Sequence, residues 1–168
     1  MTRKSSFAPV VNADVRVLIL GSLPGEMSLA RQQYYAFPQN KFWELVGAVI
    51  DMELRALPYA ARLDALLARG IGLWDVIAEA ERSGSLDAAI RNETHNALVE
   101  LVERLPKLRA VAFNGGTSAR HGRRQLAHYG DRLAMIDLPS SSPAYTAPLA
   151  QKRAAWAVLR TCLPDLRA

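Results

Sequence analysis

Four stretches of the chain carry residues that could bind a ligand or do chemistry on one. They read Gly-Ser-Leu-Pro-Gly at 21–25, Tyr-Tyr-Ala-Phe-Pro-Gln-Asn at 34–40, Asn-Gly-Gly at 114–116 and Leu-Pro-Ser-Ser-Ser-Pro at 138–143. Glycines let a ligand or another backbone come close, and the two prolines around the serines restrict that loop. Taken alone, each stretch could also be an ordinary turn or a helix cap.

Residues 34–40 combine aromatic rings with a terminal amide. One ring of Tyr34, Tyr35 or Phe37 could stack on a planar base, and the alternative is that the rings pack under a loop. Asn40 stands at the start of a helical pattern, so its ordinary role would be an N-cap. A helix N-terminus also favours anions and bound water, which leaves a second role open to this amide.

The histidines and the cysteine form no pattern for metal or nucleophilic chemistry. His95, His121 and His128 lack the spacing of a metal-ligand set or of a triad with serine. Cys162 is the only cysteine of the chain, which excludes an intramolecular disulfide and a four-cysteine iron–sulfur cluster. We therefore expect no metal and no cofactor.

Strand-like and helix-like segments alternate along the chain and would position these loops. The segments that predict strands are residues 15–20, 72–76, 110–114 and 134–138. The segments that predict helices are residues 40–50, 59–68, 96–105, 117–129 and 150–162. The alternation predicts an α/β fold with three α/β/α layers and a short, mostly parallel four-stranded central sheet. Three polar stretches then follow strands, so they should meet at the carboxyl edge of the sheet.

Length and composition predict one globular domain. The chain has 168 residues, 50% of them hydrophobic, and we expect a single domain over residues 1–168 with a loosely ordered segment at 1–13. We find neither an apolar run that could span a membrane nor the apolar stretch of a secretory signal. A formal net charge of +5 favours a polyanionic partner such as nucleic acid, or is simply a solvated basic surface.

Six segments of the chain together resemble the uracil-DNA glycosylase superfamily. They read GSLPG, QYYAFPQNKFW, GIGLWDV, RSGSLDAAI, FNGG and LPSSSPAY. Within the superfamily they are most similar to the hypoxanthine-DNA, or deoxyinosine, glycosylases, and the resemblance spans roughly residues 15–160. The segment FPQNKFW is also similar to a Pro-x-Asn-[Arg/Lys]-Phe-Trp segment of the mismatch-specific uracil/thymine glycosylases.

The resemblance implies a role for each motif. Many superfamily members hold the attacking water with an Asp or Asn at the position of Leu23, whereas the hypoxanthine family uses an Asn that falls on Asn40, the implied catalytic residue. Tyr35 falls on the aromatic residue that stacks on the base. The implied base-binding residues are Gly21, Ser22, Leu23, Tyr35 and Asn114. The implied DNA-binding residues are Gly25, Ser140, Ser141, Ser142 and Pro143.

The resemblance also implies the reaction. We expect a monomeric, monofunctional enzyme in the cytoplasm, at the nucleoid, that acts on double-stranded DNA containing deaminated bases, chiefly hypoxanthine. The nucleotide would be flipped out of the duplex, and Asn40 would hold water against an oxocarbenium-like sugar. Leu138 stands where relatives carry a polar residue for uracil, so we expect weak uracil excision. Glu26 and Asp137, the nearest carboxylates in the sequence, are expected to be structural.

Two other functions stay open at this point. The first is a uracil or broad-specificity deaminated-base glycosylase, which would differ only in the base that it removes. The second is a non-catalytic α/β module that binds nucleotides or single strands through the same loops. Assaying duplexes that contain inosine, uracil or xanthine against every opposing base tests the first alternative. Abasic sites left in inosine-containing DNA without metal would exclude the second.

Overall fold

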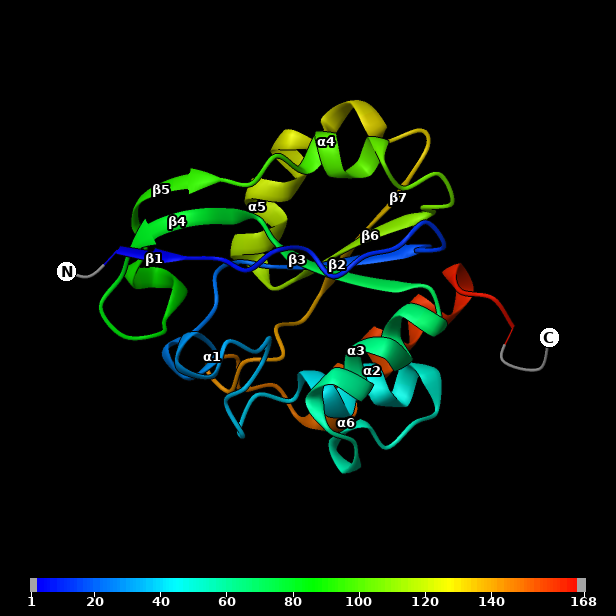
Figure 1. Ribbon diagram of the computed structural model, residues 1–168, viewed down its shortest axis with the longest axis horizontal. Helices are drawn as coiled ribbons and strands as arrows, with labels where there is room; N and C mark the ends of the chain where they lie inside the picture. The colour runs from blue at the N-terminus through cyan, green and yellow to red at the C-terminus, as the bar shows by residue number, and fades with distance from the viewer. Residues whose placement is uncertain (1–2, 166–168) are drawn as a thin grey trace.

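Four parallel strands form the central sheet of the structure, a computed structural model that describes residues 3–165 (Figure 1). In spatial order they are β3 (Ile71–Asp75), β2 (Val17–Gly21), β6 (Ala110–Asn114) and β7 (Ala134–Leu138). Every neighbouring pair in this sheet is parallel, which confirms the prediction. β2 and β6 are buried along their whole length, and this explains their unbroken apolar sequence.

Helices cover both faces of the sheet and complete the three predicted layers (Figure 1). One face carries α2 (Phe42–Ile50), α3 (Tyr59–Ala68) and α6 (Leu149–Trp156), with the 3-10 turns η1 (Leu54–Ala56) and η4 (Ala157–Cys162). The other face carries α4 (Leu98–Glu103), α5 (Gly116–Gln125) and the turn η3 (Ala127–Tyr129). The helix expected over 59–68 is confirmed, whereas those expected over 117–129 and 150–162 each end in a separate 3-10 turn.

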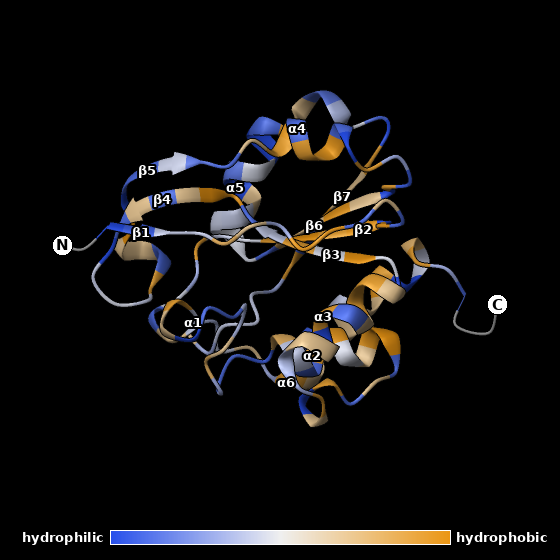
Figure 2. Cartoon of the chain, viewed as in Figure 1, coloured by the Kyte–Doolittle hydropathy of each residue, from blue (hydrophilic) through white to orange (hydrophobic). Residues whose placement is uncertain are grey.

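Each helical layer closes its own hydrophobic core against the sheet. The core under α2 and α6 includes Phe42, Trp43 and Trp156, which are at most 1% exposed. The core under α4 and α5 includes Leu98 and Phe113, both fully buried. Figure 2 shows the strands of the central sheet largely in orange between helices that carry both blue and orange residues, as expected for amphipathic helices on a buried sheet.

A second, antiparallel sheet lies beside the first and was not predicted. Its order is β1 (Arg3–Ser5), β4 (Ile77–Glu81) and β5 (Arg91–His95), and the connection from β4 to β5 contains the turn η2 (Asp87–Ala89). Its sequences, RKS, IAEAE and RNETH, are rich in charged residues and lack a continuous apolar face. Backbone pairing forms this sheet, so side-chain periodicity gave no signal for it.

The N-terminal segment is part of that sheet. We expected residues 1–13 to be loosely ordered, which is wrong for residues 3–13: β1 pairs with β4, and Val10 forms a bridge with Leu73. The indole of Trp74 also donates to the carbonyl of Phe7 at 2.9 Å. Residues 1–2 lie outside the described residues. Among residues 3–165, no helix combines the length and the apolar character that crossing a membrane requires.

Candidate active site

A cavity of about 690 Å³ opens at the carboxyl edge of the central sheet. This volume is in the range of roughly 300–1,000 Å³ that is typical of small-molecule sites. The loops after β2, β6 and β7 line it, together with α1 (Glu26–Arg31) and the connection between β4 and β5. Its lining includes every predicted site residue: Gly21, Ser22, Leu23, Gly25, Tyr35, Asn40, Asn114, Ser140, Ser141, Ser142 and Pro143. The structure brings these residues together, and the role of each stays a prediction.

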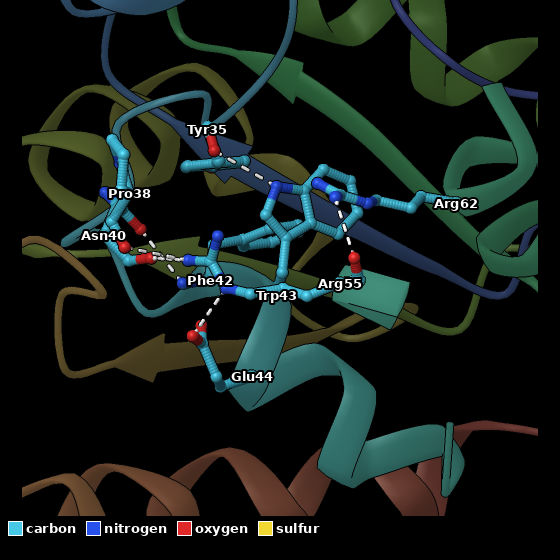
Figure 3. Close-up of polar contacts among 8 residues, drawn as sticks. All are labelled: Tyr35, Pro38, Asn40, Phe42, Trp43, Glu44, Arg55 and Arg62. Carbon is cyan, nitrogen blue, oxygen red and sulfur yellow. Dashed lines mark hydrogen bonds and ion pairs between the residues drawn. The ribbon is translucent and has the colours of Figure 1, made fainter. Parts of the chain in front are cut away.

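Asn40 is held at the entrance to α2 by both its side chain and its backbone (Figure 3). Asn40 is not the N-cap residue that we predicted, because Lys41 holds that position, but its Oδ1 accepts a hydrogen bond from the N–H of Phe42 at 3.0 Å, in the first turn of α2. Arg55 donates to the carbonyls of Asn40 and Pro38 at 2.8 and 3.0 Å. The Nδ2 group of Asn40 has no hydrogen-bond partner within residues 3–165, so it remains available to a ligand or a water.

Arg55 is a residue that the sequence analysis did not identify. Its Nε forms an ion pair with Glu44 at 2.5 Å, and the same guanidinium spans the turn that ends at Asn40. Both side chains are about two-thirds or more buried, so the pair is less screened than a surface ion pair. Arg55 therefore positions the candidate catalytic amide without lining the cavity.

Tyr35 is fixed in an unusual backbone conformation. Its φ is 55°, in the left-handed region that side chains other than glycine rarely adopt. The indole of Trp43 donates to its carbonyl at 3.1 Å, and its ring stacks on Phe42 with 3.9 Å between centroids. Such a conformation costs about 1–3 kcal/mol, and the backbone preference of a tyrosine would not favour it. The contacts with Trp43 and Phe42 offset this cost. One face of the ring is covered by Phe42, and its proposed stacking on a base would use the other.

Asn114 links the loops after β6 and β7. Its Nδ2 donates to the hydroxyls of Ser141 and Tyr35 at 2.9 and 3.3 Å, and its Oδ1 accepts from the N–H of Ser141 at 2.9 Å. Both amide hydrogens are therefore used inside the protein. In this conformation Asn114 positions its neighbours, and donating to a base would require it to release one of them.

The serine loop, residues 140–142, differs from the prediction at its central residue. Ser141 is 1% exposed and bonded to Asn114, so its hydroxyl does not face a DNA phosphate as we expected. Ser140 and Ser142 accept hydrogen bonds from N–H groups two residues ahead, and within residues 3–165 their hydroxyl hydrogens have no acceptor. The buried ammonium of Lys152 donates to the Ser142 carbonyl at 3.1 Å, and burial lowers its pKa. Lys152 is a second positioning residue that the sequence analysis missed.

Two carboxylates in the cavity were also missed. Asp75, the last residue of β3, is 4% exposed and has no hydrogen-bond partner for either carboxyl oxygen within residues 3–165. Asp87 comes from the connection between β4 and β5 and accepts a hydrogen bond from Ser22 Oγ at 2.6 Å. Burial, and secondarily the charge of Asp87, raises the pKa of Asp75 to about 7, although Arg82 acts in the opposite direction. The available signal was a charged residue inside an apolar strand, GLWDV.

Close packing around Gly21 shows how near these groups lie to one another. A Cβ on Gly21 would be 2.6 Å from Asp75 Oδ1 and 2.9 Å from the Tyr35 hydroxyl. Only glycine leaves room for both groups against the backbone at the end of β2.

The two carboxylates that the sequence analysis considered, Glu26 and Asp137, form exposed ion pairs with Lys4 at 3.4 Å and Arg123 at 3.0 Å.

Comparison with known proteins assigns the family. The family model described as the uracil DNA glycosylase superfamily matches residues 8–166. The chain belongs to the uracil DNA glycosylase superfamily. It is therefore a DNA glycosylase, a hydrolase of N-glycosyl bonds, and DNA is its substrate.

Two curated relatives and one solved structure support this assignment. A hypoxanthine DNA glycosylase of Methanosarcina barkeri is 37% identical over 155 residues, which cover 92% of this chain and 96% of the relative. A hypoxanthine DNA glycosylase of Methanosarcina acetivorans is 44% identical over 112 residues, 67% of this chain and 71% of the relative. The solution NMR structure of a candidate uracil DNA glycosylase from M. acetivorans superposes with a TM-score of 0.85 at 37% identity and covers 99% of this chain and all of its own.

Two apolar residues of this glycosylase stand where the resemblance implied polar residues in many relatives. Leu23 is 7% exposed and Leu138 is 4% exposed, and each packs into one of the two hydrophobic cores. Leu23 lines the cavity, whereas Leu138 is not part of its lining. Neither side chain can orient water or hydrogen-bond an anionic base.

A group of possible metal ligands lies outside the cavity lining of the glycosylase. Glu93 and His95 of β5 and His121 of α5 bring one donor atom each within 4.8 Å of one another. The sequence spacing gave no sign of this group, because the histidines are 26 residues apart and meet only where β5 lies near α5. The ring centroids of His95 and His121 are 4.7 Å apart.

Proposed function

We propose that this protein is a monofunctional glycosylase that removes hypoxanthine from deoxyinosine in double-stranded DNA by hydrolysis. The observation that carries the proposal is the cavity, whose lining includes both Asn40, with its unpaired Nδ2 group, and Tyr35, whose ring stacks on Phe42. Two relatives named hypoxanthine DNA glycosylase, similar over most or much of the chain, support the choice of base.

The cavity accommodates a base only after it has left the duplex. Flipping a nucleotide costs a few kcal/mol, and less for a mismatched or damaged base, which favours inosine over normal nucleotides. Tyr35 stacks on the flipped base, and backbone N–H groups of residues 21–25 are available to its edge. The apolar side chain of Leu23 cannot hold a water molecule beside a bound uracil. We therefore expect weak excision of uracil.

Asn40 acts by positioning water rather than by deprotonating it. Its Oδ1 already accepts the N–H of Phe42, and its free Nδ2 hydrogens can donate to a water oxygen. An amide is not a useful base at neutral pH, so the glycosidic bond breaks largely before water attacks. The transition state then has oxocarbenium character, and catalysis depends on positioning and on stabilising the leaving base.

The remaining contacts are to the DNA backbone. The hydroxyls of Ser140 and Ser142 and the backbone near Gly25 and Pro143 grip phosphates beside the flipped nucleotide, and the net charge of +5 supplies a salt-dependent attraction. We expect the protein to work as a monomer on chromosomal DNA in the cytoplasm.

A glycosylase assay on the purified full chain tests the proposal. Duplexes containing inosine, uracil or xanthine opposite each normal base are incubated with enzyme in excess, with and without EDTA, and abasic sites are detected by alkaline cleavage. We expect cleavage of inosine duplexes in EDTA, faster than cleavage of uracil duplexes, and little with Asn40→Ala.

Two results of this assay would redirect the assignment. Rapid removal of uracil opposite adenine, a stable pair, would favour the broad-specificity alternative. Binding of DNA without abasic sites in any duplex would reject the proposed function and favour a non-catalytic binding module.

A further inference from the structure

Asp75 is a buried acid in the cavity, and no cation of residues 3–165 forms an ion pair with its carboxyl group. It is 4% exposed, and its Oδ2 is fully buried without a hydrogen-bond partner within residues 3–165. Its Oδ1 faces the end of β2, where only the glycine at position 21 leaves it room. A carboxyl group in such a place is ordinarily bonded or ion-paired, because an unpaired buried charge is strongly unfavourable. The absence of a protein partner suggests that the partner is the ligand.

The groups around Asp75 favour its neutral form. Asp87 faces it from the β4–β5 connection with a like charge, and the phenols of Tyr34 and Tyr35 adjoin it without contributing a cation. Arg82 is the nearby cation, but its guanidinium donates to the carbonyls of Pro24 and Gly84 instead. The pKa of Asp75 is raised to about 7, mainly by burial, so a large fraction carries a proton at neutral pH.

We propose that protonated Asp75 is the general acid of this glycosylase and gives its proton to a ring nitrogen of the departing purine. This role rests on the proposed function. As the bond between C1′ and the purine nitrogen breaks, its electron pair stays on the base, and the Asp75 proton neutralises that charge. Water then adds to C1′ and releases one proton to solvent, and Asp75 regains a proton from solvent. The products are neutral hypoxanthine and an abasic sugar.

Other side chains of the cavity do not offer this proton. Asn114 uses both amide hydrogens inside the protein, and Asn40 can donate only a hydrogen bond. Burial raises the pKa of the Tyr35 phenol further above its usual value, so it is a weaker acid than an exposed tyrosine. Asp87 and Glu26 are exposed at the cavity, where Asp87 accepts a hydrogen bond from Ser22 and Glu26 forms an ion pair with Lys4.

Single-turnover rates on an inosine duplex, measured from pH 5 to pH 9, test this role. The wild-type rate should be constant at low pH and fall as pH rises through about 7. Asp75→Asn keeps the shape and should lower the plateau by about 10²-fold or more, the usual scale for a general acid, and remove the fall at high pH. Asp87→Asn removes the like charge, so the fall should move to lower pH. Circular dichroism and melting temperature establish that each variant is folded.

The outcomes separate this role from the proposed function. Wild-type cleavage that persists in Asp75→Asn with the same rate and pH profile overturns the role of Asp75 and leaves the function intact. A wild-type rate that increases as pH rises through 7 also overturns it, because the ionised carboxylate would then be the active form. Failure of the wild-type protein to release hypoxanthine at any pH overturns the function and this role together.

A second, independent observation concerns the three side chains on β5 and α5. The side chains of Glu93, His95 and His121 make no hydrogen bond or ion pair within residues 3–165, although their donor atoms lie within 4.8 Å of one another. His121 is 8% exposed, and its Nδ1 is buried without a partner. Three donor atoms that converge without bonding any protein group are the arrangement expected of a metal-binding site without its metal.

The geometry points to a site for a divalent cation, with Zn²⁺ the best match to two imidazoles and one carboxylate. Small side-chain movements would bring the donors to the separation of about 3.3 Å that tetrahedral coordination needs. Arg120 and Arg124 oppose a cation here, and Glu93 offsets them in part. The bound ion would tie β5 to α5. It would thereby hold the connection that carries Ser85, Leu86 and Asp87 into the cavity wall.

Zinc titration of EDTA-treated protein, freed of chelator by dialysis, tests this site. Zn²⁺ should raise the melting temperature of the wild type and be taken up from a chromophoric zinc indicator with one equivalent bound. His95→Ala and Glu93→Gln change exposed ends of the site and should each weaken uptake by roughly tenfold or more, whereas His128→Ala should not. No thermal shift and no uptake by the wild type would overturn the site, as would equal uptake by wild type and His95→Ala.

Discussion

The amide of Asn114 bonds Ser141 twice, to its hydroxyl through Nδ2 and to its backbone N–H through Oδ1, with both distances 2.9 Å. These two bonds join the loops that follow β6 and β7, and a third bond reaches the Tyr35 hydroxyl at 3.3 Å. One side chain therefore sets the relative positions of the serine loop and the aromatic wall of the cavity.

Replacing Asn114 should loosen the cavity as well as the fold. Asn114→Ala leaves the buried N–H of Ser141 without a partner, and an unsatisfied buried donor costs about 1–3 kcal/mol. Urea unfolding should show this loss, and single-turnover cleavage should fall because Tyr35 and the serine loop are no longer held. Ser141→Ala is the matched control, since it keeps the backbone bond and should cost less. Equal stability of the wild type and Asn114→Ala would contradict the account.

Asn40→Ala separates catalysis from capping. The variant should lower single-turnover cleavage of an inosine duplex by about 10²-fold or more, the scale for losing one positioned polar group. Its free energy of unfolding should fall by only about 1 kcal/mol, for the lost bond to Phe42 N–H. Gln39→Ala, an exposed neighbour outside the cavity lining, should change neither. A folded Asn40→Ala enzyme that cuts at the wild-type rate would show that another group holds the water.

Gly21 should not tolerate even one additional carbon. In Gly21→Ala, the new Cβ would lie 2.6 Å from Asp75 Oδ1, so the carboxyl or the end of β2 must shift. We expect a lower melting temperature and a large loss of cleavage. Gly116→Ala is the control, because a Cβ there meets nothing within 4 Å and alanine is the better helix former in α5. If the two variants have the same melting temperature and the same rate of cleavage, the close approach of Asp75 to Gly21 does not matter for function.

Asp75 should make stability depend on pH in a defined direction. Its pKa is raised from 3.8 to about 7 in the folded protein, so between these values the folded state binds more protons than the unfolded state. The free energy of unfolding should therefore fall as pH rises from about 4 to about 7, by about 4 kcal/mol at 1.36 kcal/mol per pKa unit. In Asp75→Asn, the free energy of unfolding should not show this fall of about 4 kcal/mol between the two pH values. Chemical denaturation at several pH values measures both, and parallel profiles would refute the raised pKa.

The serine loop should contribute affinity without selectivity. Ser140→Ala and Ser142→Ala should weaken binding to every DNA sequence alike, by about 1 kcal/mol for each neutral donor, because phosphate contacts carry no base information. The ratio of inosine to uracil cleavage should not change. Fluorescence anisotropy and melting curves on the same variants distinguish this from a purely structural role, in which stability falls and DNA affinity of the folded protein stays the same.

The sequence by itself determined the central architecture and the location of the cavity. Apolar strands that alternate with periodic helices leave few arrangements besides a parallel sheet between two helical layers, because parallel connections must cross the sheet through helices. The carboxyl ends of those strands share one edge. For this reason Gly21, Asn114 and Ser140, far apart in the chain, could be placed in one cavity before any contact was known.

Only the tertiary structure decided what each side chain in that cavity has left to offer. Asn114 uses its amide in a hydrogen bond to Ser141, a buried residue 27 positions away, and no local sequence pattern predicts such a bond. Asp75 looked like an ordinary strand residue until its burial and lack of a partner were known, and burial is what raises its pKa. The small antiparallel sheet likewise depends on backbone pairing between distant segments. That pairing, together with the packing of α5, is what brings His95 within reach of His121.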